Sequence, residues 1–204
     1  MNYLKKYKFF LIVLMIVSII SCNKNTRETE LNKDLNAQGQ SASNNIESNT
    51  MVYPLVYVDN SKSEQVPDFV WEQNGKQIRF SDFIKNKYVL LNFWGTWCPP
   101  CRRELPDLVQ IAKEMSDKNL IVIGVALERT STMSDAIDGV STFWNSNGLN
   151  YPIIIGTGEL ADAYGGIQAV PTTFLIDNHG KIAKVIEGAR TKESFYEQLK
   201  SIMK

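Results

Sequence analysis

Cysteine and histidine are scarce in this sequence, whose 204 residues include only Cys22, Cys98, Cys101 and one histidine, His179. Three cysteines cannot form the dense disulfide framework of small secreted domains. A structural zinc site normally takes four Cys or His ligands, and no second cysteine pair is present to complete one. The sequence therefore predicts no metal site, and we expect no cofactor.

The chain also has no excess of positive or negative charge, since 22 Lys and Arg residues balance 22 Asp and Glu residues. The chain has no basic stripe of the kind that binds nucleic acid, so we expect no nucleic-acid partner. It also has no apolar run of the roughly 20 residues that a transmembrane helix requires. Hydrophobic residues make up 44% of the chain, which suits an ordinary globular core.

The longest apolar run lies near the amino terminus. Lysines at positions 5, 6 and 8 precede Phe9 to Val17. A basic segment followed by about a dozen mostly apolar residues is typical of a signal peptide. The segment ends in Ile19-Ile20-Ser21-Cys22, which resembles the bacterial lipobox, in which the cysteine becomes the lipidated first residue of the mature protein. The alternative is an uncleaved signal anchor whose cysteine is incidental.

We therefore interpret residues 1–21 as a lipoprotein signal peptide and Cys22 as the lipidation site. The signal contains three of the 22 basic residues and no acidic one, which leaves 19 basic against 22 acidic residues in the mature chain. From position 23 to about 49 the chain is polar and cannot bury enough surface to order itself. We expect residues 22–50 to be a lipidated, flexible tether and residues 51–204 to form one domain, with its core at 64–204.

The motif that carries chemistry is Trp97-Cys98-Pro99-Pro100-Cys101, which follows an apolar run from Tyr88 to Trp94. The run predicts a buried strand. The residues from Pro99 to Met115 predict a helix with prolines in its first turn, where a missing N–H costs little. Two thiols three positions apart at a strand-to-helix junction are placed for reversible disulfide chemistry. The sequence therefore predicts a thiol–disulfide oxidoreductase.

Cys98 is the expected nucleophile. We expect it at the exposed N-terminus of the helix, where unpaired backbone amides and the positive end of the helix dipole favour a thiolate. A pKa lowered from about 8.5 to near 7 would leave half of the thiol ionised at neutral pH. Cys101 lies one turn further along the helix, and we expect it to be buried and to resolve the mixed disulfide with a client protein.

Other segments predict an α/β protein with a mixed sheet. Asn74-Gly75 predicts the tight turn of one hairpin, and Asp177 to Gly180 the turn of a second. Met51 to Val58, interrupted by Pro54, is expected to add an edge strand or to pack on the domain. Ser81 could cap a short helical turn. Further strands are expected at 120–126, 172–176 and 181–186, and further helices at 133–144, 159–164 and after Thr191.

The order of these elements, with Val170-Pro171-Thr172-Thr173 before the second hairpin, resembles the thioredoxin fold. The segments Phe93 to Pro106, Val66 to Phe69 and the helical segment between Glu128 and Asn150 resemble membrane-tethered TlpA/ResA-type oxidoreductases. The resemblance covers about residues 64–204. It implies a thioredoxin-like three-layer sandwich with a central mixed sheet, an N-terminal β-hairpin extension and a helical insertion.

The resemblance also implies a substrate-binding set beside the cysteines. Pro171 matches the proline that is cis in the thioredoxin fold and packs beside the two sulfurs. Val170 then offers backbone groups to an extended substrate, and Trp97 is expected to flank and shield Cys98. The alternative for Pro171 is a trans proline that opens a strand, since the cis form is a minority of X–Pro bonds.

Glu104 is the candidate proton acceptor. Asn92 stands where thioredoxin itself carries a buried acid that takes a proton from the resolving thiol, and an amide cannot do this at neutral pH. Glu104, three residues after Cys101, matches an acidic residue that the TlpA/ResA group shows near its cysteines. Its pKa would be raised if it is half-buried. The alternative is a solvated glutamate that the helix dipole favours in the first turn.

We expect an extracytoplasmic enzyme whose Cys98–Cys101 pair reduces disulfides of specific client proteins. The family mostly receives electrons from a membrane dithiol donor, and cytochrome c maturation is one of its uses. The lipid anchor would hold the protein, as a monomer, at a membrane of the cell envelope, facing the periplasm in a Gram-negative cell. The sequence leaves open which membrane carries it, the client and the direction of electron flow.

Two other functions stay open at this point. Peroxiredoxins share the fold, but their reactive cysteine follows Pro-x-x-x-Thr/Ser-x-x-Cys. Leu91 and Gly95 occupy the Pro and Thr/Ser positions here, which argues against a peroxidase. The remaining alternative is a tethered binding module in which the two cysteines form an inert bond.

Overall fold

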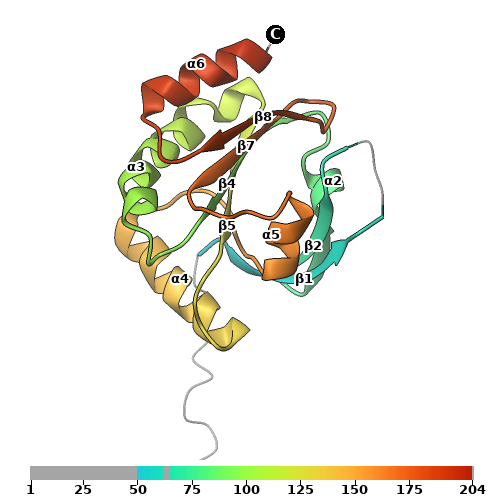
Figure 1. Cartoon of the computed structure of the whole chain (residues 1–204), viewed down its shortest axis with the longest axis vertical. Coiled ribbons are helices and arrows are strands. Elements are labelled where there is room, and N and C mark those ends of the chain that lie inside the picture. Colours follow the sequence, from blue (N-terminus) through green and yellow to red (C-terminus); the bar gives the residue numbers. More distant parts are fainter. Residues whose placement is uncertain (1–49, 62–64, 204) are drawn as a thin grey trace, which may run out of the picture. The chain divides into compact units, whose positions relative to one another are not determined.

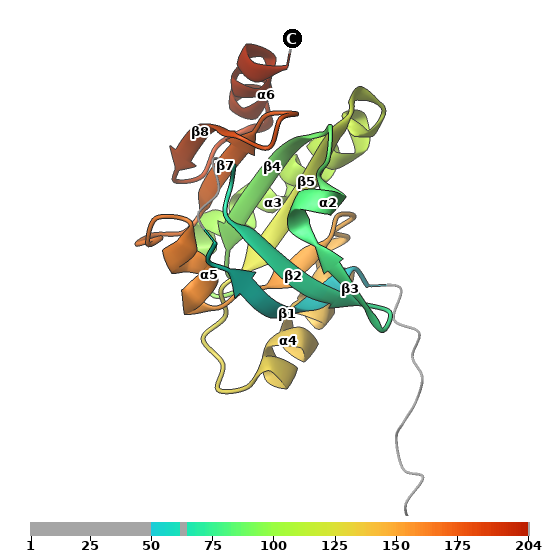
Figure 2. The same cartoon turned by 90° about the vertical axis from the view of Figure 1, so that its right-hand side faces the viewer.

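A mixed sheet of eight strands runs through the part of the chain that the computed structural model describes, residues 50–61 and 65–203. The strand order is β3-β2-β1-β6-β5-β4-β7-β8, and helices cover both faces (Figure 1 and Figure 2). This confirms the predicted α/β class with a central mixed sheet. The predicted signal peptide, Cys22 and residues 23–49 of the tether lie outside the described residues.

The elements follow one another as strands and helices with short connections. The strands are β1 (Val52–Asp59), β2 (Asp68–Gln73), β3 (Lys76–Arg79), β4 (Tyr88–Trp94), β5 (Leu120–Ala126), β6 (Ile153–Ile155), β7 (Thr172–Ile176) and β8 (Ile182–Glu187). The helices are α2 (Phe80–Phe83), α3 (Pro99–Glu114), the 3₁₀ turn η1 (Ser116–Lys118), α4 (Met133–Asn147), α5 (Gly158–Ala163) and α6 (Lys192–Ile202). Among the described residues, no helix has the length and apolar character needed to span a bilayer.

β4 lies inside the sheet, between β5 and β7, and positions the cysteine motif. It pairs in parallel with β5 and antiparallel with β7. Leu90 belongs to the core under α3, α4 and α6, whereas Leu91 belongs to the core under α2 and α5. Successive strand residues point to opposite faces, so an uninterrupted apolar run fills both cores. The three predicted layers are therefore present.

β1 lies inside the sheet, so the prediction of an edge strand is wrong. Val52 to Pro54 pair in parallel with β6, and from Leu55 onward the strand pairs antiparallel with β2. Pro54 has no N–H to donate, and it stands where the strand changes partner, beside an irregularity between Leu55 and Tyr57. The edges of the sheet are β3 and β8.

β6 is a strand that the sequence pattern does not predict. Its three isoleucines pair in parallel with β1 on one side and β5 on the other, and all three are buried. Three residues are too few to show a periodicity. The strand exists because two longer strands flank it, which is a consequence of tertiary pairing.

The predicted hairpin before the cysteine motif is confirmed. β2 and β3 pair antiparallel, and Asn74 and Gly75 both have positive φ, 52° and 72°. Two central residues with positive φ make the tight turn whose twist matches that of paired strands. The predicted cap by Ser81 is wrong, because Ser81 lies inside α2.

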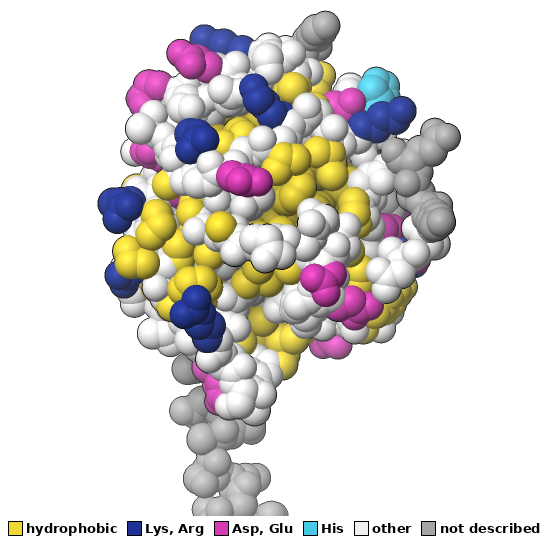
Figure 3. All heavy atoms as spheres, viewed as in Figure 1, with side chains coloured by type: hydrophobic (Ala, Val, Ile, Leu, Met, Phe, Trp, Pro, Cys, Tyr) yellow, Lys and Arg dark blue, Asp and Glu magenta, His cyan; other side chains and the backbone are white. Residues whose placement is uncertain are grey.

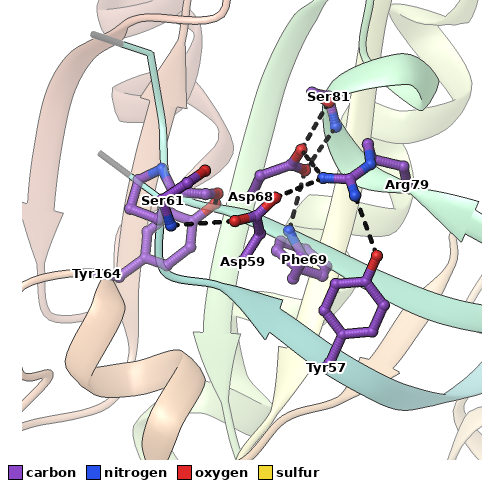
Figure 4. A network of polar contacts seen from close by, with 9 residues as sticks. Tyr57, Asp59, Ser61, Asp68, Phe69, Arg79, Ser81 and Tyr164 are labelled. Carbon is purple, nitrogen blue, oxygen red and sulfur yellow. Dashed lines mark hydrogen bonds and ion pairs between the residues drawn. The ribbon is translucent and has the colours of Figure 1, made fainter. Parts of the chain in front are cut away.

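Asp68 takes the capping role instead, in a network that joins β1, β2, β3 and α2 (Figure 4). Its carboxylate accepts hydrogen bonds from the backbone N–H groups of Phe69 and Ser81, at 2.9 and 3.0 Å, and from the Ser81 hydroxyl at 2.7 Å. Arg79 forms ion pairs with both Asp68 and Asp59, at 2.9 and 2.8 Å. The network fixes the hairpin extension against the rest of the sheet.

Replacement of Asp68 by alanine should lower the free energy of unfolding by about 1–2 kcal/mol, because a cap and its donors lose their acceptor. Asp68→Asn keeps one carbonyl oxygen and should cost less. Urea denaturation of the full chain, followed by tryptophan fluorescence, measures both. An unchanged midpoint in Asp68→Ala would contradict the capping role.

Candidate active site

The two cysteines of the motif lie where β4 ends and α3 begins. Cys98 is the N-cap residue of α3, and Cys101 lies in its first turn. The two sulfurs form a disulfide, with the Cα atoms 5.3 Å apart. The backbone N–H of Cys101 donates to Sγ of Cys98 at 3.2 Å. A sulfur at this position takes the place of the side-chain oxygen that usually caps a helix, and the N–H that it accepts would also stabilise a thiolate.

Cys98 is buried, so the prediction of an exposed position is wrong. The residue is only 2% exposed, and Cys101 is fully buried. Sγ of Cys98 lies 3.5 Å from the carbonyl oxygen of Val170, on the loop that precedes β7. This loop covers the sulfur from a part of the chain 72 residues away, which the local sequence around Cys98 does not reveal.

The peptide bond between Val170 and Pro171 is cis, as predicted. Pro171 is buried and Val170 is half-buried. The carbonyl of Pro171 accepts from the backbone N–H of Gly188 at 2.8 Å. The loop between α5 and β7 and the loop after β8 therefore meet beside the disulfide.

Trp97 lies next to Cys98 in the chain but is tied to the loop after β5. Its indole N–H donates to the carbonyl of Leu127 at 2.9 Å, and the guanidinium carbon of Arg129 lies 3.5 Å from the ring centroid. A Cβ atom on Gly95 would lie 2.5 Å from the indole nitrogen, so only glycine fits under the ring. The residue Trp97 as a whole is 38% exposed.

The same loop after β5 also holds the residue before Trp97. Glu128 accepts from both the backbone N–H and the hydroxyl of Thr96, each at 2.7 Å. Charge-assisted hydrogen bonds of this length are strong, and two from one residue fix its backbone and its side chain together. Glu128 thereby fixes the segment that leads into Cys98.

Glu104 is buried, at 2% exposure, and lies on the same face of α3 as Cys101 because residues three apart are neighbours on a helix. The side-chain N–H₂ of Asn92 donates to one carboxylate oxygen at 2.9 Å and to the Thr173 hydroxyl at 3.0 Å. The backbone N–H of Arg190 donates to the other carboxylate oxygen at 3.1 Å. The alternative of a solvated glutamate is therefore wrong.

Burial raises the pKa of Glu104 to about 7, although the hydrogen bonds from Arg190 and Asn92 act in the opposite direction. The desolvation of a carboxylate is the larger effect because water reaches almost none of it. A carboxyl group with a pKa near neutrality can both take and release a proton under physiological conditions.

Asn92 and Tyr151 complete the buried surroundings of Glu104. The Asn92 carbonyl oxygen and the Tyr151 hydroxyl have no hydrogen-bond partner among the described residues. Burial raises the pKa of the Tyr151 hydroxyl, and the nearby charge of Glu104 raises it further, so the phenol stays neutral. Asn92 and Tyr151 add no positive charge beside the carboxyl group, and the positive charge of Arg190 lowers its pKa less than burial raises it.

The structure brings the predicted site residues to one place, where β4, β5 and β7 end or begin. Cys98, Cys101, Glu104 and Val170–Pro171 are joined by the contacts described above, and Trp97 flanks them. The sequence reasoning missed Thr173, Glu128, Arg129 and Arg190. Glu128 and Arg129 follow the carboxyl end of a parallel strand that neighbours β4. Functional groups gather at such ends, so their position was a usable signal.

Three comparisons with known proteins bear on this site. The sequence matches the Redoxin family over residues 61–200. A relative from Bacillus subtilis (strain 168) named thiol-disulfide oxidoreductase ResA is 35% identical over 144 residues, which cover 70% of this chain and 76% of the relative. The matched region includes the cysteine motif and the strands that position it.

Solved structures agree with the sequence matches. A thiol:disulfide interchange protein of the thioredoxin family from Chlorobium tepidum TLS has 32% sequence identity and a TM-score of 0.59, covering 72% of this chain and 100% of that one. The exposed lipoprotein thioredoxin Etrx1 from Streptococcus pneumoniae has 32% identity and a TM-score of 0.53, covering 66% of this chain and 98% of that one. The predicted thioredoxin-like fold is confirmed.

Proposed function

Because this chain belongs to the Redoxin family and is a thiol–disulfide oxidoreductase of the ResA type, we propose that it reduces disulfides of client proteins through Cys98 and Cys101. The observation that carries the proposal is the N-cap position of Cys98, whose sulfur accepts the Cys101 N–H beside a buried cis proline. The substrate-binding set is Trp97, Val170 and Pro171.

The first step is attack by the Cys98 thiolate on one sulfur of the client disulfide. A bond forms between Sγ of Cys98 and that sulfur, the client S–S bond breaks, and the second client sulfur leaves as a thiolate that takes a proton from solvent. The start of α3 stabilises the attacking thiolate through the Cys101 N–H and the helix dipole. The carbonyl oxygen of Val170 lies 3.5 Å from Sγ of Cys98. An extended client segment would therefore pair with the backbone of Val170.

The second step releases the client. Cys101 gives its proton to the Glu104 carboxylate, and its thiolate attacks Sγ of Cys98. The Cys98–Cys101 disulfide forms, and the remaining client sulfur leaves and is protonated. The client has then gained two electrons, both from the enzyme, and two protons, one from solvent in the first step and one from the Glu104 carboxyl group in the second. Buried Glu104 suits this role because its pKa of about 7 lets it accept a proton at neutral pH.

A dithiol donor at the membrane would return the disulfide to the dithiol state. Cytochrome c maturation, in which apoprotein cysteines must be reduced, is one process that needs such an enzyme. We propose that the protein works as a monomer.

The reduction potential of the Cys98–Cys101 couple tests the direction of electron flow. Titration of the full chain against a dithiol buffer should give about −270 mV or below, the range of reductases, whereas about −120 mV would indicate an enzyme that donates disulfides. Reduction of insulin disulfides and consumption of peroxide, measured on the same preparation, separate the alternatives. Peroxide consumption without disulfide reduction would overturn the proposal, and so would inactivity in both assays.

We further propose that residues 1–21 are removed as a lipoprotein signal peptide, that Cys22 carries lipid and that residues 22–50 tether the domain to a membrane of the cell envelope. The lipobox-like segment before Cys22 supports this. A protein of similar structure bears the name exposed lipoprotein thioredoxin, which is consistent with an extracytoplasmic position.

Cys22→Ala should prevent lipidation, because no sulfur remains at the processing site. In cells grown with labelled fatty acid, the wild-type chain should carry the label and sediment with membranes, and the variant should lose the label. Cys98→Ala serves as the matched control, since it also removes a thiol but leaves the lipobox intact. Label retained by Cys22→Ala would contradict the assignment.

A further inference from the structure

An exposed guanidinium lies over Trp97, the residue before Cys98. The indole of Trp97 lies over Gly95 on one side and under the guanidinium of Arg129 on the other, 3.5 Å from the ring centroid. Its N–H is already used by the carbonyl of Leu127. A client that approaches Cys98 over Trp97 therefore meets the exposed side chain of Arg129 before it meets the ring.

Three more arginines are exposed on the elements that carry the site. Arg102 and Arg103 lie in the first turns of α3, directly after Cys101. Arg190 is exposed on the loop after β8, and its neighbour Gly188 donates to the carbonyl of Pro171. On the face shown in Figure 3, Lys and Arg side chains lie beside exposed apolar side chains along the side of the molecule that α3 and α4 occupy.

Most carboxylates on these elements accept hydrogen bonds from other residues of the chain. Glu104 is buried and accepts the N–H of Arg190, and both oxygens of Glu128 are occupied by Thr96. Asp107 accepts the backbone N–H of Lys192. Glu187, on β8 opposite Thr172, and Glu114, which forms an ion pair with Lys192, are the exposed carboxylates on α3 and β8. Glu128 and Asp107 keep their negative charge but are half-buried, so on these segments the four exposed guanidinium groups outnumber the exposed carboxylates.

We propose that three arginines select client segments that carry Asp or Glu close to the reactive cysteine. They are Arg129, whose guanidinium lies over the Trp97 ring, and Arg102 and Arg103. The inference rests on the proposed reduction of client disulfides and specifies the chemical class of the client. An extended segment that pairs with the backbone of Val170 would pass Cys98, and Trp97, Arg102 and Arg103 lie within five residues of Cys98 in the chain. Charges in solution interact across a Debye length of about 8–10 Å. Complementary charge at that range raises the rate of encounter and disfavours basic clients.

Three synthetic peptides test the proposal. Each contains one internal disulfide and the same residues between its cysteines, and the four flanking positions are Asp and Glu, Ser and Gln, or Lys and Arg. The reduced full chain in neutral detergent is mixed with each peptide, quenched with acid, and the reduced peptide is quantified by chromatography. At low ionic strength, the second-order rate constant of reduction should be about tenfold higher for the acidic peptide than for the basic one, and the ratio should shrink in 0.5 M salt.

Four variants assign the preference to residues. Arg129→Gln should lower the acidic-to-basic ratio about threefold, and Arg129→Lys should keep most of it because the charge stays. The double variant Arg102→Gln/Arg103→Gln should lower the ratio as well. Lys76→Gln, which removes a positive charge from the turn at the far edge of the sheet, should leave the ratio unchanged.

The outcomes separate the inference from the function on which it rests. Equal rates for all three peptides in the wild-type chain would overturn the charge preference while leaving disulfide reduction intact. A preference that Arg129→Gln and the double variant both leave unchanged would overturn the assignment to these arginines. Failure to reduce any peptide would contradict the proposed function itself, and the client class with it.

Discussion

Replacement of Cys98 by serine should abolish disulfide exchange, lowering the rate of insulin reduction by at least about 10³-fold, to the background of the assay. A serine hydroxyl is not ionised at neutral pH and cannot exchange with a disulfide. The loss should be complete because Cys101, the other thiol in the described part of the chain, lies inside the first turn of α3 and lacks the N-cap position that stabilises the Cys98 thiolate.

Cys101→Ser should behave differently, because the attacking sulfur is still present. This variant should react once with a client and stop, since no second thiol is available to attack the Cys98–client bond. A mixed disulfide should accumulate to about one client per chain and should be visible by mass spectrometry and on non-reducing gels. Reducing agent should release it.

The pair of variants distinguishes an enzyme from a binding module with an inert bond. Insulin reduction by Cys98→Ser at the wild-type rate would remove Cys98 from the mechanism. A mixed disulfide trapped on Cys101 in Cys98→Ser would show that the roles of the two cysteines are reversed. Circular dichroism of both variants provides the control, since each replaces sulfur by oxygen at a buried position and should keep the fold.

Glu104→Gln should slow the resolving step by about 10²-fold, because a glutamine cannot take the proton of Cys101. In the wild-type chain, the rate of resolution should rise with pH through about 7, where the Glu104 carboxyl group ionises. The variant should lack this rise. Stopped-flow release of client from a preformed Cys98–client mixed disulfide measures the step by itself. Alkylation of Cys98 should remain within a few-fold of wild type, which separates proton transfer from a general disturbance of the site.

The same carboxyl group should make stability depend on pH. Burial raises the pKa of Glu104 from 4.5 to about 7, so between these values the folded chain holds a proton that the unfolded chain has released. Its stabilising contribution is complete below pH 4.5 and is lost as pH rises through 7, a difference of about 3 kcal/mol. Relative to wild type, Glu104→Gln should therefore become more stable as the pH increases across this window.

The local structure can accept the glutamine. The carbonyl oxygen of Asn92 has no partner among the described residues, so a turned amide could accept from the new side-chain N–H₂. Glu72→Gln is the matched control, since it makes the same exchange at an exposed position on β2. Urea unfolding of the three chains from pH 4 to pH 9 measures the effect. A constant difference between Glu104→Gln and wild type would contradict the raised pKa.

The chemistry of this protein could be predicted from short stretches of sequence. The spacing of Cys98 and Cys101, after a fully apolar strand and before a helix with prolines in its first turn, is a local pattern, and the structure confirms the strand, the helix and the disulfide. The cis bond before Pro171 could be expected from resemblance to the thioredoxin fold. Asn74 and Gly75 determine the backbone conformation of the turn that they form, so the position of the hairpin could be predicted from the sequence.

Other features depend on residues far apart in the chain, and only the tertiary structure decided them. β6 is a strand because β1 and β5 flank it, and Cys98 is buried because the loop with Val170, 72 residues later, covers it. Glu104 has its raised pKa because packing against other elements buries it, and this burial outweighs the hydrogen bonds from Asn92 and Arg190, which lower the pKa. Periodicity and spacing act through the backbone within a few residues, so sequence by itself determined the reactive pair. Burial and electrostatic environment are set by packing, and these decide how that pair can react.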